Sequence, residues 1–107
     1  MRGAIFRLRN SRDAQGHEQS GDRFAVVVQA RRLEHLSTWV VVPTSSSPHA
    51  RRGLVRPVID WGAGESVVLC DAIVSVDPER RLTKQVGFVT LGQMQEIDRA
   101  LTFLLDL

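Results

Sequence analysis

The stretch Gly16-His-Glu-Gln-Ser-Gly-Asp-Arg23-Phe-Ala-Val-Val-Val28 joins a polar loop bounded by glycines to a run of apolar, mostly β-branched residues. Such a run is typical of a strand covered on both faces, and we predict one over residues 24–29. The loop carries groups that can accept or donate protons, so its side chains would lie at the end of a buried strand. Loops held by a strand are a common place for chemistry, which makes this one the first candidate site.

Other apolar and β-branched runs indicate that much of the chain forms short strands. We expect strands over residues 3–8, 38–42, 73–76 and 86–89, and a hairpin between residues 54–60 and 66–69. Pro43 should end the strand before it or mark an edge or a bulge, because proline has no N–H for a sheet ladder. The polar residues 9–22 and 44–53 predict two loops, and residues 30–36 could form one or two helical turns.

The clearest helix signal lies near the C-terminal end of the sequence. Thr90 and Gln93 form a T-x-x-Q capping box, which is typical of a helix N-terminus. The apolar residues that follow at helical spacing should share one face; they are Leu91, Met94, Ile97, Leu101 and Leu104. Asp77 and Pro78 predict the start of a second, short helix. Short strands with one long terminal helix indicate an α+β fold, a small twisted β-barrel packed on that helix, as a single domain over residues 1–107.

The charges are unevenly distributed along the sequence. Residues 1–57 contain ten Arg and four acidic residues, a balance of +6, whereas residues 58–107 have a balance of −4. This asymmetry is a weak indication that the N-terminal half binds a polyanion. Thirteen of the fourteen basic residues are Arg, which suits bidentate phosphate contacts, although GC-rich codon usage produces the same bias.

The single cysteine and the absence of a long apolar run suggest a cytoplasmic protein. Cys70 has no possible internal disulfide partner and lies in an apolar run, where cysteine usually acts as a small hydrophobe. No apolar segment approaches the ~20 residues that span a bilayer, so we expect no membrane association.

Five motifs in one order resemble the MazF/PemK family of toxin endoribonucleases. They are Arg2-Gly-Ala-Ile-Phe6, the loop Gly16–Val27, Val41–Ser46, Asp71–Asp77 and Val86–Leu101. The loop resembles the family pattern G-x-E-Q-x-G-x-R-P-[AV]-V-V, with Phe24 in place of the proline. The resemblance implies an SH3-like barrel, a homodimer, and sequence-specific cleavage of single-stranded RNA without a metal or another cofactor. It also implies inhibition by an antitoxin whose disordered acidic tail folds into a groove of the toxin.

The chemistry of a nuclease can be examined on the residues themselves. The three histidines show no metal-binding spacing, and a magnesium site built from Asp60, Glu65, Asp71 and Asp77 is the remaining metal alternative. Without a metal, the available nucleophile is the ribose 2′-hydroxyl, which predicts a 2′,3′-cyclic phosphate and a 5′-hydroxyl as products.

Arg23 is the candidate that stabilises the negative charge developing on the phosphate oxygens. Glu18 and His17 are candidates for proton transfer, the first by its place in the motif and the second by its ordinary pKa. The resemblance adds Asp71, which falls where some family members use a carboxylate. It also places the catalytic hydroxyl on Ser45, with Thr44 as the alternative, because adjacent strand residues face opposite ways.

Candidate RNA-binding residues come from both loops and from the strand between them. They are His17, Gln19, Phe24, His49, Arg51 and Arg52. Arg and His can contact phosphates or stack on unpaired bases, while Phe24 could stack on a base or fill the space of the absent proline. The alternatives are a non-enzymatic toxin on the same fold, similar to the CcdB gyrase poisons, and an RNA-binding module without catalysis. Departures from the family pattern at Phe24, Leu69 and Ala72 make the second conceivable.

Overall fold

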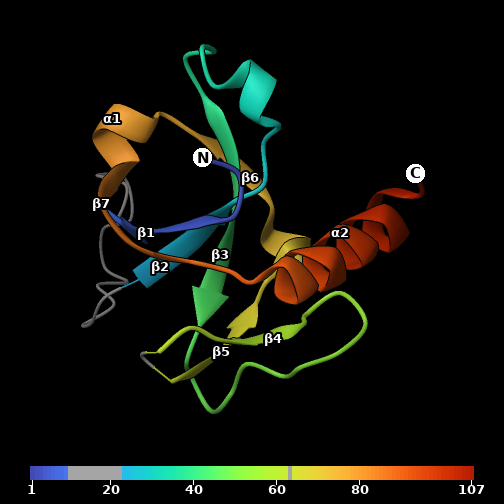
Figure 1. Cartoon of the computed structure of the whole chain (residues 1–107). Coiled ribbons are helices and arrows are strands. Elements are labelled where there is room, and N and C mark those ends of the chain that lie inside the picture. The colour runs from blue at the N-terminus through green and yellow to red at the C-terminus, as the bar shows by residue number, and fades with distance from the viewer. Residues whose placement is uncertain (10–22, 63) are drawn as a thin grey trace.

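A curled sheet forms the framework of the computed structural model, which describes residues 1–9, 23–62 and 64–107 (Figure 1). Its strands are β1 (Ala4–Leu8), β2 (Arg23–Val27), β3 (Trp39–Ser45), β4 (Val58–Asp60), β5 (Glu65–Val68), β6 (Val74–Val76) and β7 (Leu82–Phe88). The other described elements are the helices α1 (Pro78–Arg81) and α2 (Leu91–Leu105) and the 3-10 turns η1 (Arg31–Leu33) and η2 (Cys70–Ala72). The predicted strands, the hairpin and both helices are confirmed.

The strands pair antiparallel in the order β4-β5-β3-β2-β1-β7, with β6 also beside β3. β3 changes its partner along its length, because Trp39, Val40 and Val41 pair with β6 whereas Thr44 and Ser45 pair with β5. The sheet therefore bends at β3, and Figure 1 shows β4 and β5 folded across its end. The result is an α+β fold, a half-barrel with a long C-terminal helix, as predicted.

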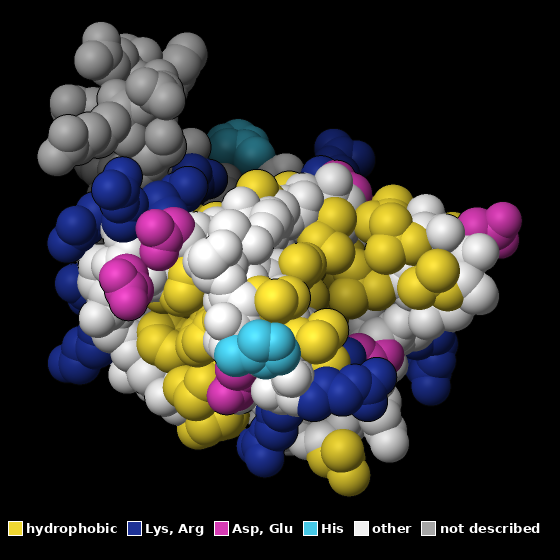
Figure 2. Space-filling model, turned by 90° about the horizontal axis from the view of Figure 1, so that it is seen from above, with side chains coloured by type: hydrophobic (Ala, Val, Ile, Leu, Met, Phe, Trp, Pro, Cys, Tyr) yellow, Lys and Arg dark blue, Asp and Glu magenta, His cyan; other side chains and the backbone are white. Residues whose placement is uncertain are grey.

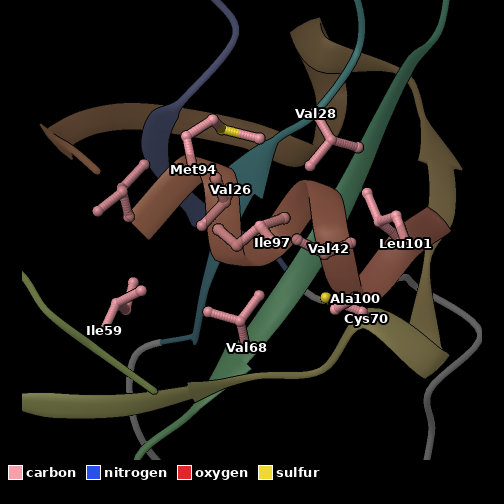
Figure 3. Close-up of a cluster of buried hydrophobic side chains, with 11 residues drawn as sticks. Val26, Val28, Val42, Ile59, Val68, Cys70, Met94, Ile97, Ala100 and Leu101 are labelled. Atoms are coloured by element: carbon pink, nitrogen blue, oxygen red, sulfur yellow. The ribbon is translucent and has the colours of Figure 1, made fainter. Parts of the chain in front are cut away.

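Both faces of β2 are buried, which explains its continuous apolar run. Val26 and Val28 belong to the helix-side core, the cluster between the sheet and α2 shown in Figure 3. Ala25 and Val27 belong to the far-side core on the other face of the sheet. The helix-side core comprises Ile5, Val26, Val28, Val42, Ile59, Val68, Cys70, Met94, Ile97, Ala100 and Leu101. The far-side core comprises Leu8, Ala25, Val27, Val41, Val76 and Leu82, with Met1, Phe6 and Trp39 packed against it.

α2 begins where the capping box predicted. The Thr90 hydroxyl accepts a hydrogen bond from the Gln93 N–H, and the Gln93 side chain accepts one from the Thr90 N–H. Met94, Ile97 and Leu101 are buried against the sheet. The expectation for Leu91 is wrong, because its side chain is 77% exposed. Leu91 is the first residue of the helix, and helical spacing does not indicate how far a helix extends beyond the sheet that it covers.

Pro43 lies inside β3 instead of ending it. The Pro43 carbonyl accepts a hydrogen bond from the Leu69 N–H at 2.8 Å, on the side of β3 that faces β5 and β6. The N–H and C=O groups of one strand residue point to the same side, so the missing proline N–H faces the gap between these two strands. No ladder hydrogen bond is lost there, which is why the strand continues to Ser45.

Neither helix of the described chain has the length and apolar character needed to cross a membrane.

Candidate functional site

Arg23 and Ser45 lie at the same end of the sheet and on the same face. Arg23 is the first residue of β2, and the β2–β3 register pairs Ala25 with Pro43 and Val27 with Val41. The ladder ends at the Ala25–Pro43 pair, and the same register extended by two residues would set Arg23 opposite Ser45. Directly opposite residues of an antiparallel pair project from one face, which here is the face of the far-side core. The predicted cation and the favoured hydroxyl thus belong to the same end and the same face of the sheet.

Thr44 and Ser45 project from opposite faces of β3, as adjacent strand residues should. Thr44 is 7% exposed, and its hydroxyl donates a hydrogen bond to the Phe24 carbonyl at 3.4 Å. The Ser45 side chain is half-buried, and its oxygen accepts a hydrogen bond from the Ser47 N–H at 3.2 Å. The hydrogen bond of the buried Thr44 side chain thus joins β3 to β2. The Ser45 hydroxyl acts as an acceptor in its hydrogen bond, so it can still donate its proton to another group.

A pocket of about 200 Å³ opens beside Ser45. The segment that follows β3 and the β4–β5 hairpin form its wall, whose members are Ser45, Ser46, Ser47, Ala50, Arg52, Val58, Glu65, Ser66 and Val67. The predicted loop over residues 44–53 carries His49, Arg51 and Arg52 and is called the basic loop below. Of these three residues, Arg52 lines the same pocket as Ser45. Ser66 was not predicted as a site residue, and Glu65 was considered only as a possible magnesium ligand. They reach the pocket because β5 pairs with β3, with Val67 opposite Ser45, and no local motif signals this pairing.

The other residues of the basic loop are exposed. His49 and Arg51 lie on the surface between β3 and β4, and the His49 N–H donates a hydrogen bond to the Ser47 hydroxyl at 3.1 Å. The loop therefore presents a histidine and two arginines to solvent next to the pocket.

Phe24 faces away from Arg23, toward the helix-side core. Its ring meets the ring of Trp61 edge to face, with 4.9 Å between the centroids. The side chain is half-buried and packs against the core cluster. Phe24 takes this direction because alternate residues of β2 point to opposite faces, and base stacking by its ring stays a prediction.

Asp71 is held by Arg56. The Arg56 guanidinium donates two hydrogen bonds to the Asp71 carboxylate, from Nε at 3.0 Å and from an Nη at 2.9 Å. Hydrogen bonding to Arg56 is the main cause that lowers the pKa of Asp71 below its ordinary value. An ionised carboxylate with a lowered pKa is a weak base, which makes Asp71 a poorer candidate for proton transfer than its position suggested.

Cys70 behaves as the small hydrophobe that was predicted. It is fully buried in the helix-side core. Burial, assisted by the charge of Asp71, raises the pKa of its thiol to about 11. The thiol therefore stays protonated at neutral pH and is a poor nucleophile.

Some predicted site residues fall outside the described part of the chain. His17, Glu18 and Gln19 belong to the segment 10–22, so their geometry relative to Arg23 is not defined. Within residues 1–9, 23–62 and 64–107, no three or more His, Cys, Asp or Glu side chains gather into a possible metal site. The four carboxylates considered for magnesium all belong to this part of the chain and form no such group.

Comparison with known proteins places the chain in a family. Residues 1–105 match the family described as PemK-like, MazF-like toxin of type II toxin–antitoxin system. A Mycobacterium tuberculosis protein whose name describes it as a candidate toxin is 30% identical over 107 residues, which cover 100% of this chain and 98% of that protein.

Solved structures of such proteins share the fold. MazF from Deinococcus radiodurans superposes with a TM-score of 0.78 at 25% identity, covering 99% of this chain and 96% of that one. A mycobacterial endoribonuclease, solved in complex with its cognate antitoxin, gives a TM-score of 0.79 at 21% identity, covering 100% of this chain and 95% of that one. The family match over nearly the full length, on a half-barrel with the same C-terminal helix, shows that this chain belongs to the PemK-like, MazF-like toxins of type II toxin–antitoxin systems.

Proposed function

We propose that this toxin is a sequence-specific endoribonuclease that cleaves single-stranded RNA without a metal ion. The observation that supports it most is the common face of Arg23 and Ser45, beside a pocket that Arg52 also lines. A phosphodiester placed there would meet a cation, a hydroxyl donor and a second arginine from three separate parts of the chain. Arginine suits this task because its planar fork donates two parallel hydrogen bonds to phosphate oxygens.

The proposed reaction is an internal transfer of the phosphoryl group. A base removes the proton of the ribose 2′-hydroxyl, the 2′-oxygen bonds to phosphorus, and the bond from phosphorus to the 5′-oxygen breaks. An acid returns a proton to the 5′-oxygen, so the products are a 2′,3′-cyclic phosphate and a 5′-hydroxyl. Arg23 would stabilise the charge on the pentavalent phosphorus, and Ser45 would donate a hydrogen bond to one of its oxygens.

The base and acid are proposed to come from the residues that precede β2 in the sequence. Glu18 and His17 precede Arg23 by five and six residues, so both are near the site in sequence. Asp71 is the third candidate, although its pairing with Arg56 favours the ionised form at all but acidic pH. Gln19, His49, Arg51 and Arg52 would bind the RNA on either side of the cleaved bond.

The partners proposed for this chain follow from its relatives. MazF of Deinococcus radiodurans has been solved together with MazE, and a mycobacterial endoribonuclease with its cognate antitoxin. We infer that the present toxin binds an antitoxin with a disordered acidic tail, acts as a homodimer and works in the cytoplasm.

The proposed activity is tested with purified protein and mixed-sequence RNA in excess EDTA. We expect fragments whose ends, identified by mass spectrometry, carry cyclic phosphates and 5′-hydroxyls. Arg23→Ala should lower the cleavage rate by ~10²- to 10³-fold, since it removes a donor needed in the transition state. Arg99→Ala is the matched control, because Arg99 is exposed on α2, on the other side of the sheet.

Each alternative has its own result in this assay. Cleavage abolished by EDTA would contradict the metal-free mechanism. RNA that is bound but left intact would indicate a non-catalytic binding module, and inhibition of gyrase with intact RNA would indicate a gyrase-poison-like toxin.

A further inference from the structure

A second and larger pocket lies at the opposite end of β3 from Ser45. Its volume is about 560 Å³, and it lies between the turn that follows η1 and the N-terminal end of α1. Trp39, the first residue of β3, lines it, so the six-residue step to Ser45 places this pocket about 20 Å from the candidate RNA site. Among the described residues, none that is proposed for RNA cleavage or RNA binding lines it.

Two aromatic rings form one wall of this pocket. Phe6 from β1 and Trp39 from β3 meet edge to face with 6.3 Å between their centroids. The Trp39 Nε1 donates a hydrogen bond to the Glu34 carbonyl at 3.0 Å, which fixes the indole against the turn. The far-side core supports both rings from behind. The two rings are therefore preorganised, so binding a ligand does not require them to become ordered.

The charged groups that line the pocket are carboxylates. Glu34, Asp77 and Glu79 contribute three, and none of the lysines and arginines within residues 1–9, 23–62 and 64–107 lines it, in a protein whose net charge is +2. His35 also lines the pocket and is exposed. Figure 2 looks onto the end of the molecule that carries η1 and α1, and it shows apolar side chains bordered by acidic ones there.

The three carboxylates differ in how far their charge is already balanced. Glu34 pairs with the N-terminal ammonium group of Met1. Asp77 caps α1 by accepting a hydrogen bond from the Glu79 N–H at 3.0 Å, and it lies 3.8 Å from the Arg80 Nε. Glu79 is exposed and has no ion pair within the described ranges 1–9, 23–62 and 64–107. A cation that enters the pocket would thus gain most from Glu79.

We propose that this pocket is a docking site for a basic peptide segment, which inserts an arginine side chain next to an apolar one. An arginine would lie against the Trp39 face and donate hydrogen bonds to Glu79, a combination of cation–π and charge-assisted contacts. The volume exceeds that of one side chain, so an apolar neighbour could cover Phe6 and Leu82. RNA is disfavoured because its phosphates would face three carboxylates, and the proposal does not depend on RNA cleavage.

The site can be monitored through Trp39 itself. The chain has two tryptophans, so Trp61→Phe leaves Trp39 as the sole indole fluorophore. The probe is the peptide acetyl-Gly-Leu-Arg-Leu-Gly-amide, compared with the same peptide carrying Gln in place of Arg. We expect a saturable change of Trp39 fluorescence with the Arg peptide, weakened by added salt, and a smaller affinity for the Gln peptide.

The matched variants are Glu79→Gln and Glu96→Gln, both made in the Trp61→Phe background. Glu79→Gln should weaken binding of the Arg peptide about twofold to fivefold, the usual range for one exposed ion pair. Glu96 is an exposed residue of α2 outside the pocket, so Glu96→Gln should leave the affinity unchanged. Urea midpoints for both variants would show that each is folded.

Three results would overturn the proposal. These are the absence of a saturable response, equal affinity for the Arg and Gln peptides, and equal effects of Glu79→Gln and Glu96→Gln. Displacement of the peptide by a short single-stranded RNA would also overturn it, because the pocket would then belong to the nucleic-acid surface.

Discussion

Arg23 and Ser45 share one face because the β2–β3 register, continued beyond the Ala25–Pro43 pair, would set these two residues opposite each other. A slip of one residue in that register would move one of them to the opposite face, next to Phe24 or Thr44. The partly buried hydrogen bond from Thr44 to the Phe24 carbonyl joins the neighbours of these two residues and opposes such a slip. At the scale of residues, Thr44 is therefore expected to hold the site together and Ser45 to act in it.

This division of roles predicts different effects for two neighbouring substitutions. Ser45→Ala should lower the RNA cleavage rate by roughly 10²-fold while leaving stability nearly unchanged, because it removes one donor from the transition state. Thr44→Val should lower the free energy of unfolding by about 1 kcal/mol, the usual contribution of one hydrogen bond, and reduce the rate far less. Single-turnover cleavage and urea denaturation measure the two quantities. A rate loss that follows Thr44 instead of Ser45 would reverse the assignment.

At the scale of elements, β3 pairs with β6 near its start and with β5 near its end. The turn η2 follows β5 in the chain. The Arg56–Asp71 pair joins η2 to the turn before β4, and both side chains are about one-third exposed, at 35% and 36%. The effect of this pair on stability depends on the charge of Asp71.

The pH dependence of stability should report this link. The folded-state pKa of Asp71 is lowered by Arg56, so the pair stabilises the fold above the unfolded pKa of the carboxyl. That contribution is lost as the pH falls through the lowered pKa. Arg56→Gln should return the pKa of Asp71 toward its ordinary value and lower stability slightly at neutral pH.

The difference between Arg56→Gln and the unmodified protein should vanish in acid, below the folded pKa of Asp71. Carboxyl NMR titration of Asp71 and urea denaturation across pH 2 to 7, roughly the range over which an Asp titrates, would measure both effects. Arg99→Gln, which removes an exposed charge far from Asp71, is the control. An unchanged Asp71 pKa in Arg56→Gln would show that the pairing does not persist in solution.

At the scale of the whole molecule, α2 covers the helix-side core and holds the two parts of the curled sheet together. Ile97 is fully buried at the centre of that contact, whereas Leu91 of the same helix is 77% exposed. Ile97→Ala should lower the free energy of unfolding by about 2–5 kcal/mol, because it leaves a cavity in a packed core. Leu91→Ala should change it by less than about 0.5 kcal/mol.

Urea denaturation at one fixed protein concentration compares Ile97→Ala and Leu91→Ala, since oligomerisation would make stability depend on concentration. Equal losses for the two variants would contradict the burial that the structure assigns to them. A larger loss for Leu91→Ala would point to a contact of Leu91 with another chain.

Local patterns in the sequence determined the elements of this protein. The apolar run of β2, the capping box at Thr90 and the Asp77-Pro78 pair each specify backbone geometry through neighbouring residues, and each element forms as predicted. The family motifs likewise named Arg23 and Ser45, because a motif carries residue identity along the chain.

The tertiary structure alone decided which residues meet. Glu65 joins Ser45 in one pocket through the pairing of β5 with β3, and Arg56 meets Asp71 across 15 residues of sequence. It also decided that Thr44 is buried, that Phe24 faces the core and that Leu91 does not. These outcomes depend on register and on the extent of packed surfaces, which arise from contacts between distant segments, and local periodicity contains no information about those contacts.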